Sequence, residues 1–389
     1  MAIKVTFSKP KAVLDIPAYF PNVIKLRNGE LFVQLMWGND KRPDQDEYDR
    51  FYAFDKPTTA ADWMKFNDDC HAIKGNSYVH VLTGHWAHSV DGGKTYTETG
   101  LPPIIEYVEK ENGDVIGLQW YTYHDKNGAP IVRSWTSHDG CRSWDAPYDI
   151  PLICPPIADA SYGKALFPHR RILHVKGDTY LVLMYGKLEG DERDRSMVFR
   201  TTDDFKTLHY YSTCGMWRPG IENPAGLNET DMARTPDGRL LCVMRNQSFM
   251  PLYQTHSIDG GATWTPLRMF IDRGVDPALC VLQNGVTVCS FGRPGVKVAS
   301  SENGGDDWQK VSTILWGGWE ENGETIRADA HGPMRSCSYT DVTETAPNVA
   351  TVYYSAPADW ADDPKKTPWD PEQRNDFRVY AVDVAVERT

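Results

Sequence analysis

The residues of this chain that could do chemistry share one place, the start of the first strand or the end of the second strand of a predicted β-hairpin. Tyrosine, histidine and carboxylate side chains can exchange protons, and arginine binds anions through its planar guanidinium fork. Glu229 is the most informative of them, because a carboxylate that faces a channel is costly unless it is paired. The candidates are His169, Arg170 or Arg171, Glu229, Arg245, Asp276, Arg293 and Tyr339.

Six hairpins would position these residues, each with an apolar strand, a turn and a second apolar strand. Five of them turn at an Asn-Gly, Asp-Gly or Gly-Asp pair, which favours the positive φ of a tight turn. The sixth keeps both strands and changes the turn. The hairpins span residues 23–37, 107–121, 172–185, 232–245, 278–291 and 338–355.

A second pattern, Ser-x-Asp-x-Gly-x-x-aromatic, follows the hairpins. Its clearest copy is SIDGGATW at residues 257–264. Further copies are SVDGGKTY at 89–96, SHDGCRSW at 137–144 and SENGGDDW at 301–308, with a remnant TTDDF at 201–205. The Ser and Asp side chains can accept bonds from nearby backbone N–H groups, while glycine takes positive φ. The pattern therefore predicts a folding device rather than a catalytic one.

Strand and hairpin units repeated along the chain predict a β-propeller, in which small sheets surround a central axis. The spacing leaves each unit room for about four short strands. We predict an all-β chain with six blades, with seven blades as the alternative, folded as a single domain over residues 1–389. A ring made from one chain closes by pairing its ends, so the strands near 3–13 and 377–386 are expected to pair.

Composition argues against several kinds of partner. The 389 residues carry a net charge of −12 and no run of Lys or Arg, which disfavours nucleic acid and anionic membrane surfaces. No apolar stretch suits a membrane helix or a signal peptide, so we expect no membrane insertion. The expected location is cytoplasmic, or secreted if a signal has been removed. The cysteines lack zinc-site spacing, and no metal or cofactor is expected.

Residues 39–78 form a long polar insertion after the first hairpin. Loops on a rigid scaffold often carry function, so this segment is expected to build one wall of a ligand cleft. A mobile surface loop is the alternative interpretation.

The repeated boxes, the six hairpins and the segment Asn228-Glu229-Thr230-Asp231 with Arg245 after the following strand resemble the exo-sialidase (neuraminidase) superfamily. The resemblance covers roughly residues 18–355 and implies roles for four residues. Tyr339 would be the nucleophile, Glu229 would activate it, and Arg245 and Arg293 would bind the substrate carboxylate. Tyr19 stands where the family has a third arginine, and Arg170 or Arg171 could substitute for it.

The implied chemistry suits an acidic sugar. Two unit charges about 4 Å apart repel by about 4 kcal/mol at an effective dielectric of roughly 20, and a neutral phenol avoids this repulsion. Asp44, Asp46 or Asp49 in the insertion, with Asp46 favoured, is expected to protonate the leaving oxygen. Further substrate-binding candidates are Arg171, Asp276 and His169.

These observations lead us to expect a glycoside hydrolase that resembles an exo-α-sialidase and removes a terminal acidic sugar from glycans. One alternative is a polysaccharide lyase or glycosidase that acts on uronate-containing chains through His169, Tyr339, Arg245 and His331. The other is a glycan-binding propeller without catalytic activity.

Overall fold

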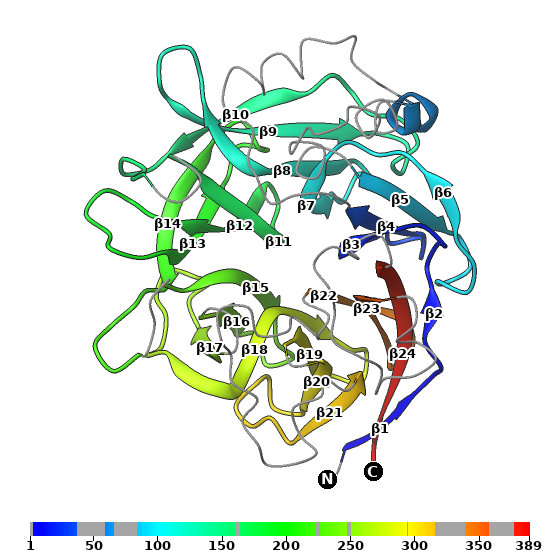
Figure 1. The fold of residues 1–389 in the computed structure, drawn as a ribbon. Helices are drawn as coiled ribbons and strands as arrows, with labels where there is room; N and C mark the ends of the chain where they lie inside the picture. Colours follow the sequence, from blue (N-terminus) through cyan, green and yellow to red (C-terminus); the bar gives the residue numbers. More distant parts are fainter. Residues whose placement is uncertain are drawn as a thin grey trace.

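The described part of the chain is almost entirely β-structure, which confirms the all-β prediction (Figure 1). The computed structural model describes residues 3–36, 59–65, 84–159, 164–221, 226–246, 250–293, 295–315, 339–357 and 377–389. Its strands follow one another in four-strand groups that surround a common centre, and the two termini lie next to each other (Figure 1).

The first three groups are antiparallel meanders in chain order. The first contains β3 (Tyr19–Lys25), β4 (Leu31–Met36), β5 (Gly84–Ser89) and β6 (Thr97–Thr99). The second contains β7 (Ile104–Glu109), β8 (Val115–His124), β9 (Pro130–Ser137) and β10 (Tyr148–Ile153). The third contains β11 (Leu166–Lys176), β12 (Thr179–Gly186), β13 (Arg195–Thr201) and β14 (Leu208–Gly215).

The fourth and fifth groups share one strand, and the last group brings the chain ends together. The fourth contains β15 (Asn228–Arg234), β16 (Leu240–Arg245), β17 (Met250–Ser257) and the first half of β18 (Arg268–Val281). The fifth continues from the second half of β18 to β19 (Thr287–Gly292), β20 (Val296–Ser301) and β21 (Lys310–Leu315). The last contains β22 (Thr340–Ala346), β23 (Val349–Pro357) and β24 (Phe377–Arg388), and β24 also pairs with β1 (Ile3–Phe7) and β2 (Lys11–Ala12).

The predicted hairpins are confirmed by the hydrogen-bonded pairs β3–β4, β7–β8, β11–β12, β15–β16, β18–β19 and β22–β23. Additional pairing joins neighbouring groups, because β10 and β14 run parallel over a short stretch and β18 is shared. The described strands therefore form four sheets of four to eight strands.

The apolar core is divided among the junctions between neighbouring groups. Val182 and Phe199 of the third group, for example, pack with Ile116 and Val132 of the second. Equivalent clusters lie at the junctions one–two, three–four, four–five and five–six. A further cluster contains strands of the first group and of the group that includes the C-terminal strand. Burial of apolar surface thus holds the sheets together all the way around the centre.

The Ser-x-Asp pattern forms turns between the third and fourth strands of the first five groups. In these box turns, at residues 89–96, 137–144, 201–205, 257–264 and 301–308, the Ser or Thr hydroxyl accepts a backbone N–H bond from four residues onward at 2.8–3.2 Å. The Asp or Asn Oδ1 accepts a second bond from four residues onward at 2.8–3.1 Å. The side chains therefore close the turns, as the pattern predicts.

A short helix at residues 60–65 interrupts the β-structure within the predicted insertion. Thr59 and Asp62 form a capping box, with the Thr59 N–H donating to Asp62 Oδ2 at 3.1 Å and the Asp62 N–H donating to Thr59 Oγ1 at 3.2 Å. Trp63 anchors the helix in the core with only 2% of its surface exposed. The described part of this helix is too short for a helical period to show in the sequence.

In the part of the chain that the structure describes, no helix is long and apolar enough to cross a membrane.

The box turns predict a measurable response to acid. Bonds from the Thr263 side chain and backbone and from the Ser257 hydroxyl lower the pKa of Asp259 from its ordinary 3.8 to about 2. The folded state is therefore stabilised by the Asp259 carboxylate, fully above the ordinary pKa of aspartate, and this stabilisation is lost as the pH falls towards 2. We therefore expect Asp259→Asn to lose less stability than the wild type between about pH 4 and pH 2, as measured by denaturant unfolding.

Asn303 occupies the equivalent position of another box turn, so asparagine fits this site. Asp272→Asn, at an exposed residue of β18, is the matched control and should follow the wild type. Parallel stability curves for the wild type and Asp259→Asn would contradict the assigned role of this carboxylate.

Candidate active site

The candidate site is formed by β-bulges that recur in the strands near the centre. The inner strands β3, β7, β11, β15 and β18 each shift register against the next strand. Such a bulge breaks the alternation of side chains and redirects them. The bulges of β3, β11, β15 and β18 contain Phe20, Arg170, Glu229 and Asp276, whose φ angles are 41°, 77°, 42° and 49°. Positive φ is uncommon outside glycine, and such strain concentrates at functional sites.

Tyr339, Glu229 and Arg245 meet at one of these bulges. The Tyr339 hydroxyl donates a hydrogen bond of 2.8 Å to Glu229 Oε1. Arg245 Nη1 donates to the same carboxylate oxygen and, at 3.2 Å, to the Tyr339 hydroxyl. Glu229 Oε2 is buried and has no hydrogen-bond partner among the described residues. The three residues come from β15, from the end of β16 and from the residue before β22, so the fold unites positions far apart in the sequence.

Burial and charge determine the protonation of this triad. Burial and the negative charge of Glu229 raise the pKa of Tyr339 far above its ordinary value, although Arg245 and Arg293 oppose the shift. Burial alone would lower the pKa of Arg245, but Glu229 and Tyr339 raise it above the usual range. Tyr339 is therefore a neutral phenol at rest, beside a guanidinium that stays charged.

Two further side chains surround the Tyr339 ring. The Phe20 ring meets it edge-on, with centroids 4.3 Å apart and an interplanar angle of 86°. The guanidinium carbon of Arg293 lies 5.8 Å from the ring centroid. Arg293 is 8% exposed and also has positive φ, at 49°. The phenol ring thus has an aromatic ring and a cation as neighbours.

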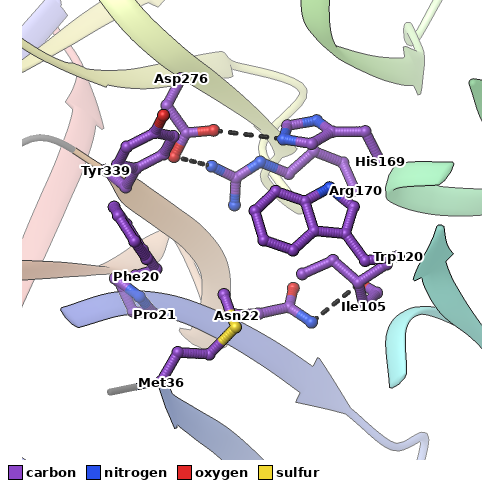
Figure 2. A pocket seen from close by; sticks show the side chains of 10 residues that line it. All are labelled: Phe20, Pro21, Asn22, Met36, Ile105, Trp120, His169, Arg170, Asp276 and Tyr339. Atoms are coloured by element: carbon purple, nitrogen blue, oxygen red, sulfur yellow. Dashed lines mark hydrogen bonds and ion pairs between the residues drawn. The ribbon is translucent and has the colours of Figure 1, made fainter. Parts of the chain in front are cut away.

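A pocket with about 360 Å³ of empty space, its open mouth included, adjoins the triad. Figure 2 shows Tyr339 and Phe20 on one side of it and Trp120 on the other. The complete lining is Phe20, Pro21, Asn22, Met36, Ile105, Trp120, His169, Arg170, Asp276 and Tyr339. Aromatic surfaces with a few polar groups are typical of small-ligand sites.

His169, Arg170 and Asp276 lie together in the lining (Figure 2). Arg170 Nη2 donates to Asp276 Oδ2 and to the Thr340 carbonyl. His169 Nε2 lies 3.4 Å from Asp276 Oδ1, and its Nδ1 lies 3.2 Å from the Thr230 carbonyl. Burial would raise the pKa of Asp276, but Arg170 and His169 lower it below the ordinary value. These contacts fix the three side chains against one another.

Arg171, one of the three arginines predicted to bind substrate, does not line the pocket. It points to other partners, with Nε 3.3 Å from Asp231 Oδ2 and Nη2 2.8 Å from the Val342 carbonyl. Arg170 lies at the pocket instead, because the bulge gives Arg170 positive φ and turns it away from its neighbour.

Six of the other predicted residues are brought together. Glu229, Arg245 and Arg293 surround Tyr339, and Asp276 and His169 line the adjoining pocket. The predicted acids Asp44, Asp46 and Asp49 lie outside the described residues, as does His331.

Phe20 and Trp120 were not among the predicted site residues. Phe20 stands at the start of the first hairpin and Trp120 near the end of the second. Selection of residues at the start of the first strand or the end of the second strand of a hairpin could therefore have identified both. Only polar side chains at these places are selected from the sequence, because those can exchange protons or bind anions, and both aromatic residues are therefore missed. Within the described ranges, no cluster of three or more His, Cys, Asp or Glu residues is arranged to hold a metal ion.

No protein-family model and no curated protein matches the sequence. Solved structures are similar in fold, including a protein of unknown function from Dyadobacter fermentans DSM 18053 with 16% identity and a TM-score of 0.65, matched over 98% of this chain and 99% of that one. An α-L-arabinanase from Penicillium chrysogenum has 13% identity and a TM-score of 0.57, over 97% and 98% of the two chains.

A third similar structure is the Hadza microbial sialidase Hz136, with 14% identity and a TM-score of 0.55. The match covers 87% of this chain and 63% of the sialidase. At such identities the likeness concerns the fold alone, and it supports a β-propeller.

The ion pairs of Arg170 predict a large effect on stability. Its side chain is 5% exposed and faces Asp276 and Asp341, whose side chains are also buried. Removing one partner of a buried pair leaves an uncompensated charge and costs about 3–5 kcal/mol. We expect Arg170→Gln to lower the free energy of unfolding by about this amount in denaturant titrations.

Arg133→Gln is the control, because Arg133 pairs with Asp149 near the surface. Exposed pairs contribute only about 0.2–1 kcal/mol. Equal losses in the two variants would show that the central pair is no more important than a surface one.

Proposed function

We propose that this chain is a glycoside hydrolase that removes a terminal acidic sugar of the sialic-acid type from glycans. The observation that carries the proposal is the 2.8 Å hydrogen bond from the Tyr339 hydroxyl to Glu229 beside a pocket, with Arg245 bonded to both. The similar folds of a sialidase and an arabinanase support a glycosidic substrate.

In the proposed reaction, the Tyr339 oxygen attacks the anomeric carbon while Glu229 takes the phenolic proton. The bond to the leaving oxygen breaks, and a general acid gives that oxygen a proton. Water then attacks the anomeric carbon and gives a proton to the general acid, while the tyrosine oxygen leaves and takes back the proton from Glu229, which gives overall retention. We propose Asp46 of the insertion as the general acid, as the sequence predicts.

The neutral phenol and the nearby cations suit an anionic sugar. A carboxylate nucleophile would repel the substrate carboxylate, whereas Tyr339 is uncharged until its proton moves to Glu229. We propose that Arg245 and Arg293 bind the substrate carboxylate from either side of the phenol. Arginine suits this role because its planar fork makes two charge-assisted hydrogen bonds.

We also propose that the ring has six blades in a single domain. The four-strand groups support this count when β18 is assigned to two of them and β1 completes the group of β22, β23 and β24. The pairing of β1 with β24 supports closure through the chain ends.

The lyase alternative has no observation in its favour. Both ring nitrogens of His169 already face partners, the Thr230 carbonyl and Asp276, and His169 is therefore poorly placed to serve as a free base.

The proposal predicts hydrolysis of 4-methylumbelliferyl α-sialoside and its loss on replacing either member of the tyrosine–glutamate pair. Tyr339→Phe removes the attacking oxygen, and Glu229→Gln removes the proton acceptor, so each should lower kcat by a factor of about 10² to 10⁴ or more. Fluorescence release under initial-rate conditions measures this effect. Tyr148→Phe, at an exposed tyrosine of β10, is the control and should retain wild-type rates.

Undiminished turnover in Tyr339→Phe would remove this residue from the mechanism. Silence on the sialoside together with a rise in ultraviolet absorbance on uronate polysaccharides would instead identify a lyase. Silence in both assays with binding to a glycan array would identify a binding protein.

A further inference from the structure

Glu106 is a buried acid that the proposed reaction does not use. It lies on the inner strand β7, directly after the pocket residue Ile105, and its exposed fraction is 0%. Neither carboxyl oxygen has a hydrogen-bond partner that meets ordinary geometry among the described residues. A carboxylate in such surroundings is strongly disfavoured, and burial of the neutral carboxylic acid costs far less.

The Glu106 carboxyl faces the bulge of β11. The β11–β12 register passes from Pro168 to Ile172, so the bulge residues between them have no regular ladder partner. Strands β7 and β11 pack against each other, and the backbone N–H of His169, one of these residues, is near enough to lower the pKa of Glu106 in part, although it makes no hydrogen bond of ordinary geometry with the carboxyl. Glu106 is therefore placed to face a backbone donor that the strand ladder leaves unused.

Charged neighbours reinforce the neutral form of Glu106. Burial raises its pKa well above the ordinary range, the N–H of His169 opposes this in part, and the negative charge of Asp231 raises the pKa further. Asp231 on β15 is itself bound to Arg171 at 3.3 Å and to the Leu279 N–H at 2.6 Å. The adjacent acid thus already has its partners and offers Glu106 only repulsion.

We propose that Glu106 is kept as the neutral acid and acts as the positioning residue of the β11 bulge, its carbonyl oxygen facing the His169 N–H. His169 and Arg170 of that bulge line the pocket, and Arg170 bonds the carbonyl of Thr340, the residue after Tyr339. A shift of the bulge would therefore displace the phenol relative to Glu229. The effect on catalysis rests on the proposed function, whereas the protonation of Glu106 does not.

The pH dependence of stability tests the neutral acid. Above the ordinary pKa of 4.5 the unfolded chain releases a proton that folded Glu106 retains, so stability falls as pH rises until the folded group ionises. Each pH unit in this window changes the unfolding equilibrium constant by about a factor of 10. Glu106→Gln resembles the neutral acid and cannot titrate, so the stability gained over the wild type should grow with pH above about 4.5.

Glu111→Gln is the matched control, because Glu111 lies in the exposed turn after β7 and should show no such trend. The protonated carboxyl should also give an infrared band in the wild type at neutral pH that Glu106→Gln lacks. A constant stability difference between Glu106→Gln and the wild type across this range, or the absence of that band, would overturn the assignment of a neutral acid.

The positioning role is tested by comparing Glu106→Gln with Glu106→Met. Glutamine keeps a carbonyl acceptor towards the His169 N–H, whereas methionine fills the space without one. We expect Glu106→Met to shift the imidazole NMR signals of His169 and to lower kcat at least tenfold with little change in KM, and Glu106→Gln to restore both. Unchanged His169 signals in folded Glu106→Met would overturn the positioning role.

These readouts separate the two proposals. If the wild-type protein hydrolyses no glycoside, the proposed function fails, while the stability, infrared and NMR measurements still decide the state and role of Glu106.

Discussion

Two adjacent arginines of β11 at the centre of the ring, Arg170 and Arg171, form ion pairs with residues on strands of other groups. Arg170 bonds Asp276 of β18, and both arginines reach Asp341 of β22. Arg171 also binds Asp231 of β15, and Asp341 accepts a hydrogen bond of 2.8 Å from the backbone of β3. A buried charge is tolerated only while its partners are present. The charges of this network therefore find all their partners only when β3, β11, β15, β18 and β22 have come together.

This dependence also connects the fold to the candidate site. Arg170 holds Asp276 on one side and the Thr340 carbonyl on the other, and the latter residue follows Tyr339 directly. The strained bulges are maintained because neighbouring groups fix their ends. Among the described residues, the side chains that contact the phenol lie on strands or directly beside them. Such rigidity suits chemistry in which a proton and a nucleophile must stay aligned.

The sequence reveals the strands better than it reveals the direction of individual side chains. Turn glycines and apolar runs identified the hairpins, and the position at the hairpin ends identified Glu229, Arg245 and Tyr339, which do lie together. Arg170 and Arg171 could not be told apart, because a bulge breaks the period of two on which such reasoning depends. The sequence does not reveal the proposed role of Glu106 for a related reason, because the residues around it belong to β11 and β15, far along the chain.

The shared strand β18 has a consequence for how the molecule moves. It pairs with β17 as far as Gly274 and with β19 from Val275, without an intervening loop. A side chain at Gly274 would bring its first carbon to 2.7 Å from Leu252, so the crossing is also tightly packed. The fourth and fifth groups consequently cannot hinge against each other at a flexible connection. Glu229 and Asp276 both belong to this continuous sheet. The distance between these two acids should therefore stay constant when other parts of the ring move.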